Sequence, residues 1–217
     1  MARLSKKTAG VSVTDPMEIL VLNMRSITAK SDKDPKSAMT KFDLLSAMCN
    51  ESKPSFIAVT ETWLDSTIPN DDIAITGYKL ERLDRDREGG GSLLYYQEHL
   101  IVRRLSIMED KAYEIMFFET ILPKVGRVLL SVNYRTPSMN NEQIDSYIHF
   151  LSETIYNILQ SNSFDAILLV GDFNAHCEEW CNTHPSTVAG KKFFDFCEAL
   201  SLKQLVREPT RVSHNGQ

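Results

Sequence analysis

Long hydrophobic runs, cysteine and an excess of positive charge are all scarce in this sequence of 217 residues. The apolar runs are short, like AILLV at 166–170, so no segment is expected to span a bilayer. The N-terminus lacks the apolar core of a signal peptide, and four cysteines are too few for a disulfide scaffold at this length. We therefore expect a nuclear or cytoplasmic protein that is neither secreted nor inserted in a membrane.

The formal net charge of −5 also argues against binding that depends mainly on neutralising phosphates. Proteins that bind nucleic acid in that way are usually basic. Two interpretations stay open: nucleic acid is not the ligand, or it is held locally while acidic residues serve another purpose, such as a metal site.

Apolar periodicity predicts one mixed α/β domain over residues 17–217, after a polar, flexible tail at 1–16. Several expected strands are apolar throughout, which indicates a sheet covered on both faces. Helices are expected at 38–49, 143–159 and about 190–200, and strands at 17–23, 54–61, 77–84, 92–97, 112–122, 127–135, 167–174 and 202–206.

Four of the expected strands end in polar residues, and this pattern is the main functional signal. Any one of them alone would be an ordinary strand cap, but ligands of layered α/β proteins collect at the carboxyl ends of strands. Carboxylate oxygens suit Mg²⁺, and amides or phenols bind phosphate without adding negative charge. The set predicts metal-assisted attack of water on phosphorus. It comprises Asn23, then Glu61, then Asn133, Tyr134 and Arg135, and finally Asp172 and Asn174.

Five motifs resemble the endonuclease domain of non-LTR (LINE-type) retrotransposons, in the endonuclease/exonuclease/phosphatase superfamily that includes DNase I. They are LNMRSI (22–27), AVTETWL (58–64), REGGGSLLYY (87–96), SVNYRTPS (131–138) and LLVGDFNAH (168–176). The resemblance covers about residues 17–217. It implies a four-layer α/β sandwich of two packed mixed β-sheets flanked by helices, and Mg²⁺- or Mn²⁺-dependent nicking of DNA.

The resemblance also implies a role for each matching catalytic residue. Glu61 and Asn23 would form the metal site, with Asn23 orienting this glutamate or the phosphate. Asp172 would orient and activate the attacking water, Asn174 would steady the pentavalent phosphate, and Tyr134 would contact the phosphate. The expected substrate-binding residues are Arg25, Tyr134, Asn174, His176 and Thr210.

The sequence departs from the family pattern near its end. The family continues to a Ser-Asp-His motif, whereas this sequence ends in RVSHNGQ, so the catalytic histidine is not assigned to His214. A general acid–base residue contributes about 10²–10⁴ in rate. We therefore expect a domain that lacks its last strands, with weak or absent activity in these residues alone. The expected partners are DNA and a reverse transcriptase domain of the same polyprotein.

Other interpretations remain open at this point. The chain could be a catalytically dead nucleic-acid-binding or domesticated module, or a phosphatase of the same superfamily. His176, Cys177, Cys181 and His184 could bind zinc, although their spacing is not that of a zinc finger. Glycines 89–91 favour a tight hairpin over a phosphate-binding loop, because a strand follows them and no P-loop lysine is present. The arginines at 82, 85 and 87 favour a solvated mixed-charge loop over a phosphate contact.

Overall fold

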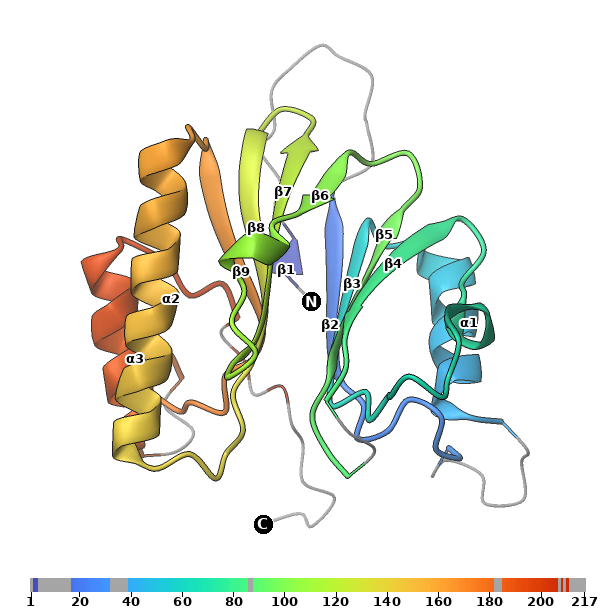
Figure 1. Cartoon of the computed structure of the whole chain (residues 1–217), viewed down its shortest axis with the longest axis horizontal. Helices are drawn as coiled ribbons and strands as arrows, with labels where there is room; N and C mark the ends of the chain where they lie inside the picture. The colour runs from blue at the N-terminus through green and yellow to red at the C-terminus, as the bar shows by residue number, and fades with distance from the viewer. Residues whose placement is uncertain are drawn as a thin grey trace. The chain divides into compact units, whose positions relative to one another are not determined.

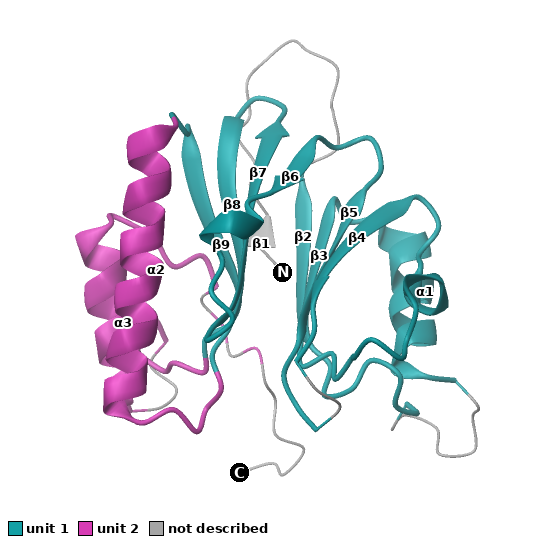
Figure 2. Cartoon of the chain, viewed as in Figure 1, with its two compact units in different colours: residues 1–135, 163–173 teal, residues 136–162, 174–217 magenta. Residues whose placement is uncertain are grey.

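The computed structural model describes residues 2–3, 17–31, 39–85, 88–181, 185–206, 208 and 210. The chain divides into two compact units, which Figure 2 colours separately. The first contains residues 1–135 and 163–173, and the second contains 136–162 and 174–217. Most of the expected tail at 1–16 lies outside the described residues. Of that segment, Ala2–Arg3 form the short strand β1, which pairs with β2.

The first unit contains two mixed sheets. One has the strand order β1-β2-β3-β5-β4, and the other has the order β6-β7-β8-β9. Each sheet contains one parallel pair, β2 with β3 and β8 with β9, and its other pairs are antiparallel. The strands of the first sheet are β2 (Glu18–Asn23), β3 (Phe56–Thr60), β4 (Tyr78–Leu83) and β5 (Ser92–Gln97), besides β1. Those of the second are β6 (Val102–Arg104), β7 (Glu114–Leu122), β8 (Gly126–Tyr134) and β9 (Ala166–Asp172).

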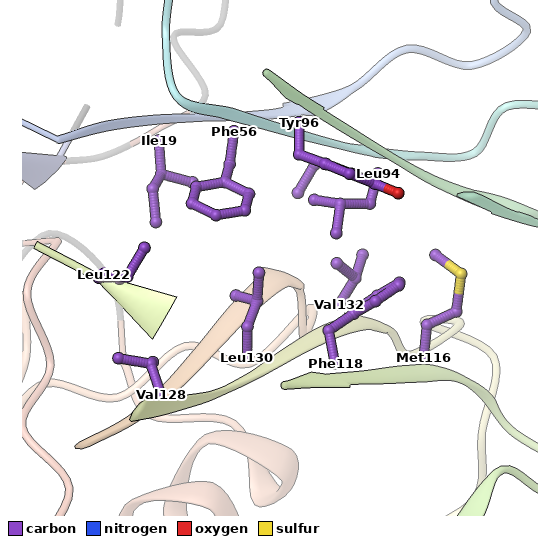
Figure 3. Close-up of a cluster of buried hydrophobic side chains, with 11 residues drawn as sticks. Ile19, Phe56, Leu94, Tyr96, Met116, Phe118, Leu122, Val128, Leu130 and Val132 are labelled. Carbon is purple, nitrogen blue, oxygen red and sulfur yellow. The ribbon is translucent and has the colours of Figure 1, made fainter. Parts of the chain in front are cut away.

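The two sheets pack face to face through one apolar core (Figures 1 and 3). Strand β3 contributes Phe56 and Ala58 to this core, and Leu130 and Val132 of β8 lie opposite. The alternate residues of β3, Ile57 and Val59, enter a second core on the outer face of the first sheet. Strand β3 is therefore buried on both faces, as its unbroken apolar sequence predicts.

Helix α1 (Lys41–Ser52) covers that outer face with Leu45 and Cys49, which are both almost fully buried. Its first turn is fixed by a capping box in which Thr40 and Asp43 each bond the other's backbone amide. The second unit contains α2 (Asn141–Ser161) and α3 (Val188–Ala199). These two helices pack against each other through Tyr147 and Phe193, whose ring centroids lie 6.1 Å apart.

The predicted two-sheet α/β architecture is confirmed, but the strand expected at 202–206 is wrong. This segment continues from α3 without a strand, and the Leu202 amide donates to the Cys197 carbonyl. Leu205 and Val206 are 43% and 39% exposed, so the apolar sequence there is not matched by burial. Strand β6 and two short 3₁₀ helices, Asn70–Ile73 and Ser106–Met108, were not predicted. Across the described ranges, no helix has the length and apolar character needed to cross a bilayer.

Candidate active site at the ends of two parallel strand pairs

Each parallel pair of the first unit ends in residues of the candidate site. Asn23 is the last residue of β2 and lies opposite Thr60 of β3, directly before Glu61. Tyr134 and Asp172 are the last residues of β8 and β9 and lie opposite one another. Because parallel strands share the edge at which they end, each ladder brings two polar side chains to one edge of its sheet.

The Asn23 amide joins the two carboxylates. Its Nδ2 donates to Glu61 Oε1 and to Asp172 Oδ2, and both distances are 2.7 Å. A carboxamide nitrogen carries two N–H donors, and both are used here. Glu61 and Asp172, 111 positions apart in the sequence, are thereby held on either side of one side chain.

The phenol of Tyr134 also belongs to this group. Its side chain is buried and lies within electrostatic reach of Glu61. Burial raises the pKa of Tyr134 to about 12, and the negative charges of Glu61, Glu114 and Asp172 act in the same direction. The phenol therefore stays protonated at neutral pH and serves as a hydrogen-bond donor.

The backbone around Glu61 is left-handed and is held by loops on two sides. Glu61 has φ 52° and Trp63 has φ 54°, which costs an ordinary residue about 1 kcal/mol. On one side, the amides of Ser26 and Ile27 donate to the Glu61 and Thr62 carbonyls at 2.9 and 3.0 Å. On the other side, the amides of Thr62 and Trp63 donate to the glycine turn that follows β4.

The loop after Asn23 carries the predicted substrate-binding residue Arg25. Its side chain is 69% exposed, and its Nε lies 3.9 Å from Glu61 Oε2. Lys41 fixes this loop, because its Nζ donates to the carbonyls of Met24 and Arg25 at 2.7 and 2.9 Å. Sequence reasoning missed Lys41, since a lysine at a helix start carries no signal of a contact with a distant loop.

Asp172 is held by the strand ladder itself. Its carbonyl accepts from the Arg135 amide at 3.0 Å, and Arg135 Nε donates to the Phe173 carbonyl at 2.6 Å. Arg135 is only 2% exposed, so this guanidinium fixes backbone inside the fold. The sequence pattern had placed Arg135 among the polar residues at strand ends without indicating this contact.

The other predicted site residues belong to the second unit. Asn174 is half-buried with φ 47°, and Thr210 is exposed. His176 is exposed, and its carbonyl accepts from the Thr187 amide at 2.9 Å. The roles of these three residues stay predictions from the resemblance.

The zinc interpretation gains no support from the described cysteines. The Cys177 thiol hydrogen-bonds to Glu179 at 2.7 Å, and no three metal-ligating side chains gather anywhere in the described residues. His184 and His214 lie outside those residues. Of the arginines in the expected mixed-charge loop, Arg82 bonds Asp84 and Arg85 bonds Glu114, whereas Arg87 lies outside the described residues.

Comparison with known proteins adds a family model and several folds. Residues 128–217 match the model described as Endonuclease-reverse transcriptase. No curated protein matches the chain at a significant level.

Three solved structures illustrate the likeness in fold. The endonuclease domain of TRAS1, a telomere-specific non-LTR retrotransposon, is 14% identical with a TM-score of 0.59, over 86% of this chain and 73% of that one. AP endonuclease LMAP from Leishmania major is 14% identical with a TM-score of 0.64, over 84% and 66%. The 3′-5′ exonuclease NExo from Neisseria meningitidis is 15% identical with a TM-score of 0.57, over 84% and 71%. At these identities the likeness establishes the fold.

Proposed function

We propose that this chain, which has the DNase I-like fold of the endonuclease/exonuclease/phosphatase superfamily, is a retrotransposon-type endonuclease domain that nicks DNA by metal-dependent phosphodiester hydrolysis. The observation that carries the proposal is the Asn23 amide, which holds Glu61 and Asp172 together at 2.7 Å each. Two carboxylates at the ends of two parallel strand pairs, with a protonated phenol beside them, would form a site for hydrolysis at phosphorus.

The donor set fits a small hard cation. Mg²⁺ binds through one or two carboxylates and completes its shell with water and substrate phosphate, so a site without a third acidic ligand is suitable. Glu61 would hold the ion, with Asn23 fixing the carboxylate from the side. A bound Mg²⁺ or Mn²⁺ would act as a Lewis acid that polarises a phosphoryl oxygen.

The residues of the chain would then divide the remaining work. Asp172, which the strand register and the Asn23 amide hold in position, would orient the attacking water and accept its proton. Tyr134 would donate a hydrogen bond from a phenol that stays protonated. The exposed Arg25 guanidinium offers a charged contact to a DNA phosphate, and by resemblance Asn174, His176 and Thr210 would contribute further contacts.

A net charge of −5 is compatible with this substrate if the contacts to DNA are local. The association with a reverse transcriptase, suggested by the description of the matched family model, is part of the same proposal. The competing function is binding of nucleic acid without cleavage.

Relaxation of supercoiled plasmid tests the proposal. The chain is assayed at high concentration with Mg²⁺, with Mn²⁺ and with chelator, beside Glu61→Gln and Asp172→Asn. We expect nicked circles only with the ion, and a rate lowered by about 10²–10⁴ in each variant. The matched control is Glu81→Gln, which removes a carboxylate of β4 that pairs with Arg104.

Three results would contradict the proposal in different ways. Equal nicking by parent and Glu61→Gln would remove this site from the reaction. A gel shift without nicking would favour the binding function. Release of phosphate from a phosphorylated small molecule, with DNA left intact, would favour a phosphatase.

A further inference from the structure

A third carboxylate, Glu114, lies close to the site without belonging to the predicted set. It is the first residue of β7 and lies opposite Tyr134 in the sheet register. Its side chain is 16% exposed, and its Oε1 accepts from Arg85 Nη1 at 2.8 Å. Its Oε2 accepts from the Gly91 amide at 2.5 Å. Glu114 therefore binds the turn between β4 and β5 with one oxygen and a neutralising cation with the other.

The two glycines of this turn are required by close approach. Gly90 has φ 67°, and a Cβ there would lie 2.6 Å from Glu114 Oε1. Gly91 has φ 82°, and a Cβ there would lie 2.5 Å from the Thr62 hydroxyl. Only glycine combines this backbone conformation with such short contacts. The glycines of the motif REGGGSLLYY thus serve packing against Glu114 and Thr62.

The Gly90–Gly91 turn also holds the backbone next to Glu61. The Gly91 carbonyl accepts from the Thr62 amide at 3.2 Å, and the Gly90 carbonyl accepts from the Trp63 amide at 3.0 Å. These bonds fix the left-handed residues on whose conformation the direction of the Glu61 side chain depends. A continuous series of contacts joins Glu114, Gly90–Gly91 and Thr62–Trp63 to Glu61.

We propose that Glu114 is a positioning residue, which sets the direction of the Glu61 carboxylate by anchoring the Gly90–Gly91 turn. The inference rests on the proposed function, because it concerns the ion that Glu61 would hold. Glu114 acts through the backbone and not as a ligand, because its two carboxylate oxygens already accept from Arg85 and from the Gly91 amide. Its charge is balanced by Arg85, which limits its repulsion of the site carboxylates.

The test is the affinity of the metal-free chain for Mn²⁺, measured by calorimetry. We expect Glu114→Ala to weaken binding about tenfold, as loss of an outer support of a metal ligand typically does. Glu114→Gln keeps an acceptor for the Gly91 amide and should recover most of the affinity. Gly90→Ala, whose Cβ would push the Glu114 carboxylate away from the turn, should weaken binding in the same direction as Glu114→Ala.

A second readout needs neither ion nor activity. Hydrogen exchange of the Thr62 and Trp63 amides in the metal-free chain should be at least about tenfold faster in Glu114→Ala, because the turn that accepts from them is released. The matched control is Glu119→Ala, which removes a carboxylate of the same strand that is 14% exposed and pairs with Arg103 and Arg127. This control should leave both readouts within about twofold of the parent.

Each outcome decides the inference. Parent-like Mn²⁺ affinity in Glu114→Ala, or an equal loss in Glu119→Ala, overturns the positioning role and leaves the proposed function standing. No Mn²⁺ binding by the parent chain overturns the proposed function, and the inference falls with it. Loss confined to Glu114→Ala and Gly90→Ala, with recovery in Glu114→Gln, supports the role.

Discussion

The two parallel strand pairs of the first unit bring a carboxylate to the same site by different means. In the pair β8–β9, Asp172 is the last residue of the ladder and lies opposite Tyr134. In the pair β2–β3, the ladder ends at Asn23 and Thr60, and Glu61 follows in a left-handed loop. Asp172 is therefore positioned by strand pairing, and Glu61 by the loops that surround it.

This difference predicts how the protein responds to substitutions near each of the two carboxylates. Near Asp172, the close contacts are made by backbone atoms of paired strands, and these atoms cannot shift without breaking the ladder. The loops at Glu61 depend on side chains that reach across, among them Lys41 and Glu114. We expect damage near Asp172 to act mainly on stability, and damage near Glu61 to act mainly on the geometry of the site.

Alanine substitutions at glycines give the strongest test of this contrast. A Cβ on Gly171, which has φ 128°, would overlap the Asn133 carbonyl, part of the neighbouring strand. We expect Gly171→Ala to lower the free energy of unfolding by about 3 kcal/mol or more. A Cβ on Gly91 would come too close to one side-chain atom, the Thr62 hydroxyl oxygen, and Gly91→Ala should cost about 2 kcal/mol.

Urea unfolding measures both losses, with Gly77→Ala as the control. Gly77 has φ 83° but nothing within 4 Å of its would-be Cβ, so backbone strain of about 1 kcal/mol is expected there alone. Equal losses for the three variants would show that strand and loop contacts are equally rigid, against the comparison.

An additional carboxylate introduced at position 23, between Glu61 and Asp172, should have the next largest effect. Asn23→Asp would place a negative charge where the amide now lies 2.7 Å from both Glu61 and Asp172. We expect the metal-free free energy of unfolding to fall by about 2 kcal/mol through repulsion. Added Mg²⁺ should restore it, because an ion that binds the folded state stabilises it.

Thermal unfolding with and without Mg²⁺ checks this prediction. Asn157→Asp introduces the same charge on an exposed position of α2 and should change little. A variant at position 23 that is as stable as the parent without the ion would mean that the two carboxylates are not held together in solution.

Loss of Lys41 tests the loop side of the comparison alone. Lys41→Met removes two charged hydrogen bonds to the carbonyls of Met24 and Arg25. We expect a loss of about 1.5 kcal/mol in unfolding free energy and Mn²⁺ binding that is a few-fold weaker. Lys192→Met, which releases Asp145 and the Asn141 carbonyl in the second unit, should leave Mn²⁺ binding unchanged. A similar drop in Mn²⁺ affinity for both variants would contradict a local role for Lys41.

The smallest expected effect concerns Cys49 of α1, which is buried in the core on the outer face of the first sheet. Burial raises the pKa of Cys49 from 9.0 to about 11, so the folded state keeps the thiol protonated where the unfolded state ionises. This contribution to stability is complete below about pH 9 and is lost as the pH rises towards 11. Cys49→Ala should flatten the fall in unfolding free energy over this range, measured by urea titration at several pH values.

The slope should persist in part, because burial also raises the pKa values of Tyr95 and Tyr78 in the same core. Cys181→Ala, at a half-exposed cysteine of the second unit, serves as the control. An unchanged slope in Cys49→Ala would show that this thiol does not titrate between the two states.

Much of the fold was predictable from local sequence, because apolar periodicity reports burial directly. The segments EILVLN and SLLYYQ form β2 and β5, and most of the predicted apolar stripe of α2 is buried. The segment 202–206 shows the limit of that signal. It has the composition of a strand, but pairing requires a partner, and no strand forms there among the described residues.

The sequence by itself determined which polar side chains follow the buried strands, because strands that end in Asn23, Glu61, Tyr134 and Asp172 are visible as a pattern. Only the tertiary structure decided that one amide joins two of these carboxylates, and that Lys41, Arg135 and Glu114 hold the backbone around them. The reason is physical. Strand ends follow from the local alternation of residues, whereas a contact between a charged side chain and a distant loop depends on the register and packing of the whole sandwich.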